Sequence, residues 1–132
     1  MSITLDFIGI VTRDLPASLA FYRELGLDIP EGAEREPHVE VLLPSGIRIG
    51  WDTLETIKSF DEAYVEPTGS HRVAFAFQAD SPAEVDAVYA RLTAAGHRSR
   101  VEPWDAFWGQ RYATVMDPDG NAIDLYAALP EA

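Results

Sequence analysis

The sequence predicts an α+β fold made of two βαβββ units. The first observation is an internal repeat, because "DLPAS" at residues 14–18 aligns with "DSPAE" at residues 80–84. The second is that each of these segments follows an apolar, β-branched run and opens a stretch in which apolar residues have helical spacing. The third is that each helical stretch is followed by short apolar runs separated by turn residues. These patterns indicate a strand, a helix and further strands, twice over.

The first unit is predicted to place one capped helix after its first strand. The helix lies within residues 13–26, where Asp14 is the N-cap and Gly26 ends the helix. The turn "PSG" provides Gly46 for a backbone with positive φ. Four strands are expected around this helix, at residues 3–12, near 27–29, at 38–44 and at 47–53.

The second unit is predicted to repeat this order. Its helix lies within residues 81–96, because Ser81 and Glu84 form a capping-box pattern and Gly96 provides a stop signal. The turn "DPDG" ends in Gly120, which again favours a hairpin. Four strands are expected here too, at residues 72–78, near 97–101, at 111–117 and at 121–127.

The two units are expected to form one domain, residues 1–132. The first unit spans about residues 1–53 and the second about 71–132, and a linker at 54–70 with one or two helical turns joins them. A unit of about 60 residues buries too little surface to be stable alone. We therefore expect the two sheets to associate.

Composition restricts the possible partners. The formal net charge of -12 disfavours binding to nucleic acid and to anionic membranes, because both require basic patches. The absence of cysteine excludes disulfides and thiolate metal sites and fits a reducing compartment. The chain begins without a signal-peptide pattern, and its apolar runs are too short to span a bilayer. We therefore expect a cytoplasmic protein whose partners are small molecules or other protein chains.

The doubled pattern resembles a known superfamily. The likeness rests on "RDLPASLAFYRELGLDIP" at residues 13–30 and "WGQRYATVMDPDGNAIDLYA" at residues 108–127, and it covers nearly the whole chain. These segments are similar to the vicinal oxygen chelate superfamily, which includes glyoxalases, extradiol dioxygenases and bleomycin-resistance proteins. The resemblance implies that each unit curls into a cupped mixed sheet and that two cups enclose a site. It also implies a homodimer, in which the units pair within a chain or are exchanged between chains.

The resemblance provides a test for a metal site. Enzymes of the superfamily hold a divalent metal with His, Gln or Glu from the first and last strands of each unit. The matching positions of this chain hold Phe7 or Asp6, Arg72 or Val73, Gly50, and Asp124. Of the residues at the last-strand positions, only Asp124 is a plausible ligand. His71 lies next to Arg72, and a one-residue slip along a strand directs it to the opposite face. We therefore expect no metal, no cofactor and no catalytic residue, since a nucleophile motif is also absent.

The aromatic residues are the remaining candidates for ligand binding. Within the superfamily, the chain is most similar to drug-sequestering proteins of the mitomycin-resistance type. This likeness rests on "PHVEVLLPSGIRIGWDTLETIKSFD", "PTGSHRVAFAF" and "EPWDAFWGQRYATVMDPDGNAIDLYAALP". It implies that His38 and Trp108 clamp a planar drug between them. The predicted ligand-binding residues are His38, Trp108, Trp51, Gly109, Phe7, Arg72, Gln110 and Trp104.

Alternatives stay open for several of these residues. Trp51 either contacts a ligand or fills the core, and Trp104 either contacts a ligand or braces the loop that carries Trp108. Gln110 and Arg111 are candidates for hydrogen bonds at a pocket rim, although Arg111 is equally suited to a surface ion pair. The predicted function is sequestration of a planar aromatic or quinone antibiotic, of mitomycin, bleomycin or quinoxaline type. The alternative is a metal-dependent glyoxalase- or dioxygenase-type lyase or isomerase, and a carrier role in an antibiotic pathway shares the binding hypothesis.

Overall fold

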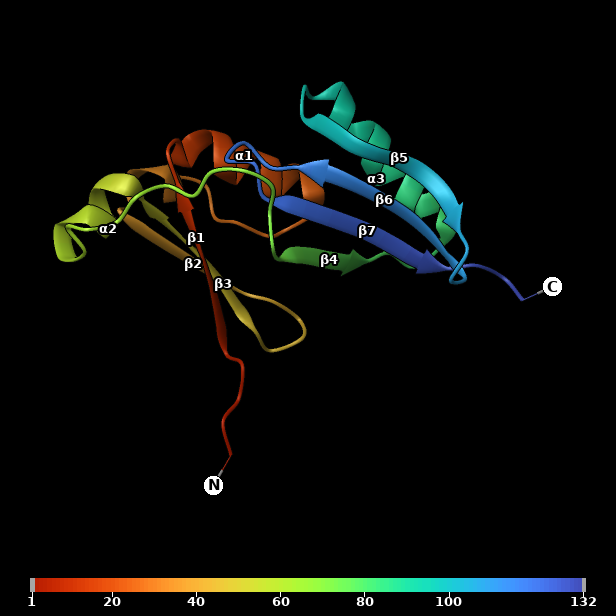
Figure 1. Cartoon of the computed structure of the whole chain (residues 1–132), viewed down its shortest axis with the longest axis horizontal. Helices are drawn as coiled ribbons and strands as arrows, with labels where there is room; N and C mark the ends of the chain where they lie inside the picture. Colours follow the sequence, from red (N-terminus) through yellow and green to blue (C-terminus); the bar gives the residue numbers. More distant parts are fainter. Residues whose placement is uncertain (1, 132) are drawn as a thin grey trace. The chain divides into compact units, whose positions relative to one another are not determined.

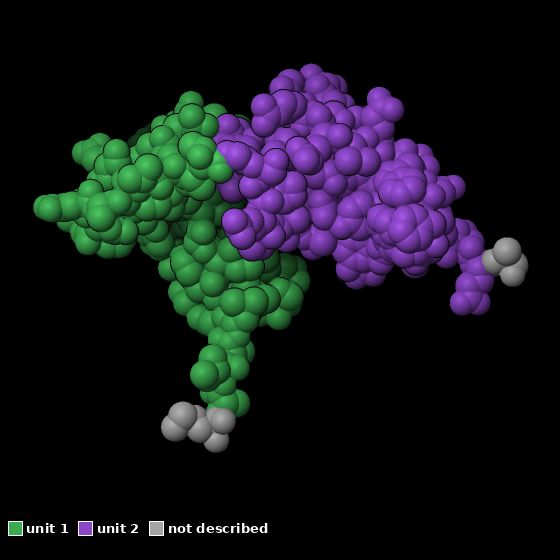
Figure 2. All heavy atoms as spheres, viewed as in Figure 1, with its two compact units in different colours: residues 1–68 green, residues 69–132 purple. Residues whose placement is uncertain are grey.

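The computed structural model describes residues 2–131, and the described residues form two compact units that divide between residues 68 and 69 (Figure 2). The chain combines two separate sheets with helices, as the sequence predicts for an α+β fold. The first sheet has three strands in the order β1-β3-β2, and the second has four strands in the order β4-β7-β6-β5 (Figure 1). In both sheets the first strand of the unit lies parallel to the last one. The two sheets therefore share one topology, and the internal repeat is confirmed.

The first unit is built around the helix α1. Its elements are β1 (Phe7–Thr12), α1 (Leu15–Leu25), the 3-10 helix η1 (Ala33–Arg35), β2 (His38–Leu42), β3 (Arg48–Thr53) and α2 (Leu54–Phe60). Asp14 caps α1 as predicted, because its side chain accepts a hydrogen bond of 3.1 Å from the backbone N–H of Ala17. Gly26 ends the helix at a φ of 122°, a conformation that favours glycine. The helix α2 provides the helical turns expected in the linker.

The short strand predicted near residues 27–29 does not form. Instead, the side chain of Arg23 donates hydrogen bonds to the carbonyl oxygens of Ile29 (3.2 Å) and Pro30 (2.6 Å) and pairs with Glu34 at 3.0 Å. The backbone N–H of Ile29 donates to the carbonyl of Leu27 at 3.1 Å, and Pro30 has no N–H, so these two residues offer no donor to a neighbouring strand. The first sheet consequently has one strand fewer than the second.

The second unit is a complete βαβββ arrangement. Its elements are β4 (Ala74–Gln78), α3 (Pro82–Ala94), β5 (Arg98–Ala106), β6 (Gln110–Met116) and β7 (Ala122–Ala128). The helix α3 contacts β5, β6 and β7 and covers one face of the sheet (Figure 1). Ser81 caps this helix as predicted, accepting a hydrogen bond of 3.2 Å from the backbone N–H of Glu84. Val85 and Leu92 of α3 are fully buried.

Two predicted boundaries of the second unit are wrong. The strand expected at residues 72–78 begins at Ala74, so Arg72 precedes it. The weak strand expected near 97–101 is the start of a nine-residue strand, β5, which continues to Ala106. Trp104 therefore lies on a strand and not in a loop, and its cross-strand partner is Tyr112.

A helix that crosses a bilayer must be long and apolar. None of the helices formed by residues 2–131 has the length and the apolar character that crossing a bilayer requires.

Candidate ligand-binding site

The face of the second sheet that is turned away from α3 carries a group of aromatic and polar side chains. Side chains alternate between the two faces along a strand, so cross-strand partners on β6 and β7 share a face. Five residues of these two strands on the side of α3 are buried, namely Ala113, Val115, Ile123, Leu125 and Ala127. The opposite face, called the aromatic face below, carries Trp104, Trp108, Tyr112, Thr114, Asp124 and Tyr126.

The rings of this face form one contiguous cluster. The ring centroids of Trp104 and Trp108 lie 5.4 Å apart at an interplanar angle of 90°, and those of Trp108 and Tyr112 lie 5.3 Å apart at 78°. Tyr112 stacks with Tyr126 at 6.3 Å. Phe107 adds an edge contact with Trp108 at 4.9 Å. Edge-to-face contacts of this kind hold the rings in place while their outer surfaces stay free for contacts.

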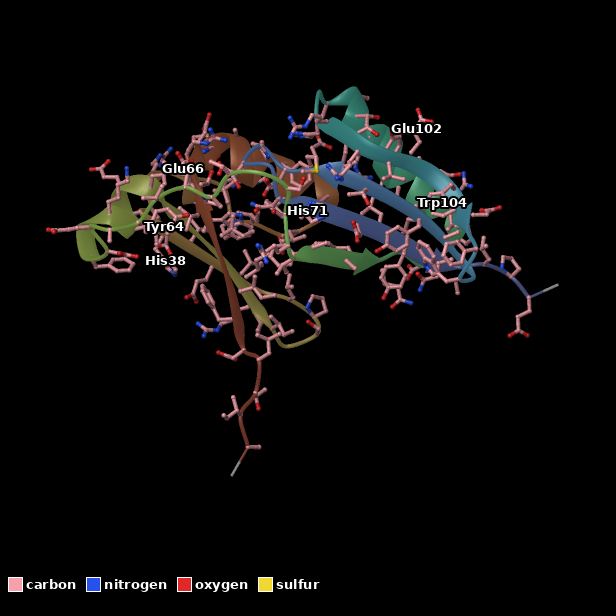
Figure 3. The ribbon with its side chains drawn as sticks, in the orientation of Figure 1. His38, Tyr64, Glu66, His71, Glu102 and Trp104 are labelled. Atoms are coloured by element: carbon pink, nitrogen blue, oxygen red, sulfur yellow. The ribbon has the colours of Figure 1, made fainter. Side chains whose placement is uncertain are left out.

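The turn between β5 and β6 positions the exposed part of the cluster. Gly109 has a φ of 91° and donates a backbone hydrogen bond of 3.0 Å to the carbonyl of Ala106, which closes the turn. The indole N–H of Trp108 donates to the side-chain oxygen of Gln110 at 2.8 Å. The side chains of Trp108 and Trp104 are 49% and 38% exposed, and such exposure is unusual for two large apolar rings in contact. Figure 3 labels Trp104.

Asp124 lies beside the rings and is bound by two hydroxyl groups. Tyr112 donates a hydrogen bond from its phenolic oxygen to Oδ2 of Asp124 at 2.5 Å, and Thr114 donates from Oγ1 to Oδ1 at 2.8 Å. Burial, together with the hydrogen bond to Asp124, raises the pKa of Tyr112 to about 12. Tyr112 is therefore a neutral phenol near neutral pH and acts as a fixed hydrogen-bond donor.

The first sheet presents a different face, centred on His38. Nδ1 of His38, which Figure 3 labels, lies 2.6 Å from Asp52, its cross-strand partner, and Nε2 lies 2.9 Å from Glu40. The hydrogen bonds to Glu40 and then to Asp52 raise the pKa of His38. A carboxylate at each ring nitrogen requires two N–H donors, and only the imidazolium form has both. The ring is thus held edge-on by two carboxylates.

Phe7 covers two glycines on the same face as His38. A Cβ atom on Gly50 would lie 2.6 Å from Cζ of Phe7, and one on Gly9 would lie 3.1 Å from its Cε1. The missing side chain at residue 50 lets the ring of Phe7 lean across β3 toward His38, with ring centroids 6.3 Å apart. The guanidinium of Arg48 lies 5.2 Å from the centre of the Phe7 ring.

Comparison with known proteins identifies the family. The sequence profile of the Glyoxalase/Bleomycin resistance protein/Dioxygenase superfamily matches residues 4–125. The chain belongs to this superfamily. No match to the chain was found among curated proteins.

Solved structures of the superfamily have the same fold as this chain. It is similar to a glyoxalase/bleomycin resistance protein/dioxygenase family enzyme from Burkholderia phytofirmans, with 23% identity, a TM-score of 0.81, and coverage of 96% of this chain and 100% of that chain. A glyoxalase/bleomycin resistance protein/dioxygenase from Nocardioides has 26% identity, a TM-score of 0.76 and coverage of 100% and 87%. A genomically encoded fosfomycin resistance protein from Listeria monocytogenes has 20% identity, a TM-score of 0.72 and coverage of 97% and 95%. The glyoxalase-like fold predicted from the sequence is confirmed.

The residues at the positions of the superfamily's metal ligands do not fit a metal. The ring of Phe7 occupies the space above Gly50, and Asp6 is engaged by Arg48 at 2.6 Å. Both carboxylate oxygens of Asp124 already accept hydroxyl groups. Within the described residues, no three His, Cys, Asp or Glu side chains are grouped so as to hold an ion. The donor set of the superfamily's metal enzymes is therefore not formed by these side chains.

The predicted ligand-binding residues fall into three groups. Trp104, Trp108, Gly109 and Gln110 lie on or beside the aromatic face. His38 and Phe7 share the open face of the first sheet. Trp51 and Arg72 belong to neither face.

Trp51 lies in the core of the first unit. It is fully buried and contacts Tyr22 of α1 edge to face, with ring centroids 5.3 Å apart. This placement favours the packing alternative for Trp51. Arg72 and His71 are exposed and precede β4. His38 belongs to the first unit and Trp108 to the second, so the clamp implied by the resemblance stays a prediction.

Sequence reasoning missed part of the aromatic face. Tyr112, Thr114 and Tyr126 were not predicted to contact a ligand, and Asp124 was considered only as a metal ligand. The available signal was the alternation of polar or aromatic with small apolar residues in "RYATVMD" and "NAIDLYA". This alternation predicts which residues share a face, but the cross-strand register that brings the two strands together is visible only in the structure.

Proposed function

We propose that this protein binds a planar aromatic small molecule on its aromatic face and sequesters it without a metal and without chemical change. The ligand class is an aromatic or quinone-bearing antibiotic of mitomycin, bleomycin or quinoxaline type. The observation that carries the proposal is the cluster of exposed rings around Trp104 and Trp108. A protein rarely leaves such rings exposed together on its surface without a binding role.

The arrangement of the rings supports stacking as the source of affinity. Each aromatic contact contributes about 0.5–1.5 kcal/mol beyond the area that it buries. Two or three such contacts, with the apolar area that they cover, account for binding in the micromolar range of about −8 kcal/mol. The Gln110 side chain holds the indole of Trp108 by a hydrogen bond of 2.8 Å, which reduces the entropy lost when a ligand binds.

The proposal extends to assembly and location. Superfamily members usually bind small molecules and form oligomers, and we propose a homodimer for this chain. The lack of cysteine is compatible with a reducing cytoplasm, where an antibiotic directed at an intracellular target would be captured. Binding to nucleic acid is not part of the proposal, because the net charge of -12 opposes it.

Calorimetric titration tests the proposed function. Mitomycin C, a bleomycin and a quinoxaline peptide are titrated into the protein with and without EDTA. We expect saturable binding of at least one of them that survives EDTA, and we expect Trp108→Ala to weaken it by about tenfold or more. Heat is the better signal, because removing Trp108 would also remove a fluorophore.

A matched control separates stacking from general surface effects. Phe60 on α2 is 72% exposed and lies outside the aromatic face, so Phe60→Ala should leave the affinity unchanged. Equal losses in Trp108→Ala and Phe60→Ala would contradict a specific site. Stoichiometric metal binding with turnover of a thioester or a catechol would favour the alternative, a lyase, isomerase or dioxygenase of the same superfamily.

A further inference from the structure

The aromatic face contains one carboxylate without a cationic partner. Among the described residues, the interactions of Asp124 are the two hydrogen bonds from Tyr112 and Thr114, and no Arg, Lys or His pairs with it. The nearby Arg111 points to the opposite face of the sheet, where it pairs with Asp86 and Asp105 at 3.0 Å. The charge of Asp124 is therefore left for a group outside the chain.

The two hydroxyl groups leave part of this carboxylate available. Each carboxylate oxygen has two lone pairs, and Tyr112 and Thr114 use one on each oxygen of Asp124. Both hydroxyl groups donate, so they fix the carboxylate in position without neutralising its charge. Two acceptor positions remain for the N–H groups of a ligand.

The surroundings of Asp124 differ on its two sides. On one side lie Tyr112 and its stacked neighbour Tyr126, which continue into the indole rings. On the other side Asp124 pairs with Ala76 of β4, an exposed residue whose neighbour on the same face is the exposed Ala74. Small side chains leave the edge of the carboxylate uncovered. A flat molecule that lies on the rings of Tyr112 and Tyr126 therefore has its edge beside Asp124, and no large side chain of β4 pairs with the carboxylate from the other side.

We propose that the aromatic face selects planar ligands that carry a positive charge, with Asp124 as the counter-charge. The chemical class is an aromatic ring system bearing an ammonium, amidinium or protonated ring nitrogen. The faces of Tyr112 and Trp108 also attract a cation through their ring quadrupoles. The net charge of -12 adds long-range attraction to such ligands. This inference rests on the proposed function and names the ligand class for the same site.

Three matched probes test the inference. Proflavine is planar and cationic, acridone is planar and neutral, and anthracene-2-sulfonate is planar and anionic. We expect wild-type protein to bind proflavine about tenfold or more tightly than acridone and to bind the sulfonate most weakly. We expect the preference for proflavine to decrease as salt concentration rises, because exposed charges are screened.

Asp124→Asn identifies the residue responsible. Asparagine has nearly the same shape and can still accept one of the hydroxyl hydrogen bonds, so the face should stay intact. The expected result is an acridone affinity within about twofold of wild type and a loss of about tenfold in the proflavine affinity. Asp105→Asn removes the same charge from the α3 side of β5, where Asp105 pairs with Arg111, and should preserve the preference.

The outcomes distinguish this inference from the proposed function. Equal binding of proflavine and acridone by the wild-type protein would overturn the charge selectivity and leave planar binding standing. Failure of all three probes and of the antibiotics to bind would overturn both. If Asp124→Asn does not fold, the wild-type comparison of the three probes and its salt dependence still decide the question. An equal loss of preference in Asp105→Asn would show that net charge, and not Asp124, is responsible.

Discussion

Trp51 provides a direct test of how the aromatic residues divide between the core and the ligand site. Its side chain is fully buried against Tyr22, and its indole N–H has no hydrogen-bond partner among the described residues. Trp51→Ala is expected to lower the free energy of unfolding by about 3–5 kcal/mol, as is typical when a large buried ring is removed. Trp51→Phe is expected to cost far less, about 0–2 kcal/mol, because the loss of packing is offset by removal of an unpaired N–H worth about 1–3 kcal/mol.

Two measurements check this prediction. Urea unfolding followed by circular dichroism gives the stability of each variant without relying on tryptophan fluorescence. Calorimetric titration of Trp51→Phe with whichever planar ligand binds the wild type gives the affinity, which should change by less than about twofold. A stable Trp51→Phe protein that binds the ligand more than about tenfold more weakly would refute the assignment of Trp51 to the core. A Trp51→Ala protein as stable as wild type would refute the packing argument itself.

Three further predictions concern the faces of the two sheets. The pKa of His38 is raised in the folded protein, so its ion pairs stabilise the fold fully at pH values below 6.5, the ordinary pKa of histidine. This stabilisation is lost as the pH rises through the raised pKa. His38→Gln should therefore lower Tm more at about pH 5.5 than at about pH 9. For the control Phe60→Ala, which leaves these carboxylate contacts intact, the change in Tm should be the same at both pH values. Gly50→Ala should force the ring of Phe7 away, which costs about 1–3 kcal/mol in urea unfolding, and Phe7→Ala in the same chain should recover most of that loss. Gly109→Ala places a side chain at a φ of 91°, so it should lower the free energy of unfolding by about 1 kcal/mol. It should also weaken ligand binding, because the strained turn moves Trp108. An unchanged affinity would mean that the turn does not position this ring.

The parts of the fold that depend on local chemistry were predictable from the sequence. Asp14 and Ser81 accept the expected hydrogen bonds from the first turns of their helices, and Gly26 ends its helix as expected. Each of these features is decided by residues within a few positions along the chain, so the sequence alone contains the necessary information.

The failures have causes that lie outside any local window. The segment after α1 has a strand-like composition, but Arg23 of α1 and Glu34 of η1 hold it by side-chain contacts instead of strand pairing. β5 contains proline and two acidic residues, which disfavour a strand in isolation, yet pairing with β6 extends it to Ala106. Tertiary contacts override local preference in both places.

The candidate site was predictable only in part, for a related reason. The exposed indoles were recognisable because two tryptophans beside a glycine are unusual in a turn. The role of Tyr112 and Tyr126 depends on their pairing as direct cross-strand neighbours, which places their rings in contact. The fixed position of Asp124 likewise depends on Tyr112 and Thr114 from the adjacent strand.

The same geometry predicts that no single substitution creates a metal site at the positions that match the superfamily's metal ligands. A carboxylate introduced at Gly50 would meet the ring of Phe7, since even a Cβ there lies 2.6 Å from Cζ. Replacing Phe7 alone would leave residue 50 without a donor. In the other unit, the position that would supply a second ligand beside Asp124 holds Arg72 or Val73, and neither side chain donates an electron pair to a cation. Within the described residues, a metal site at these positions would therefore require several simultaneous substitutions.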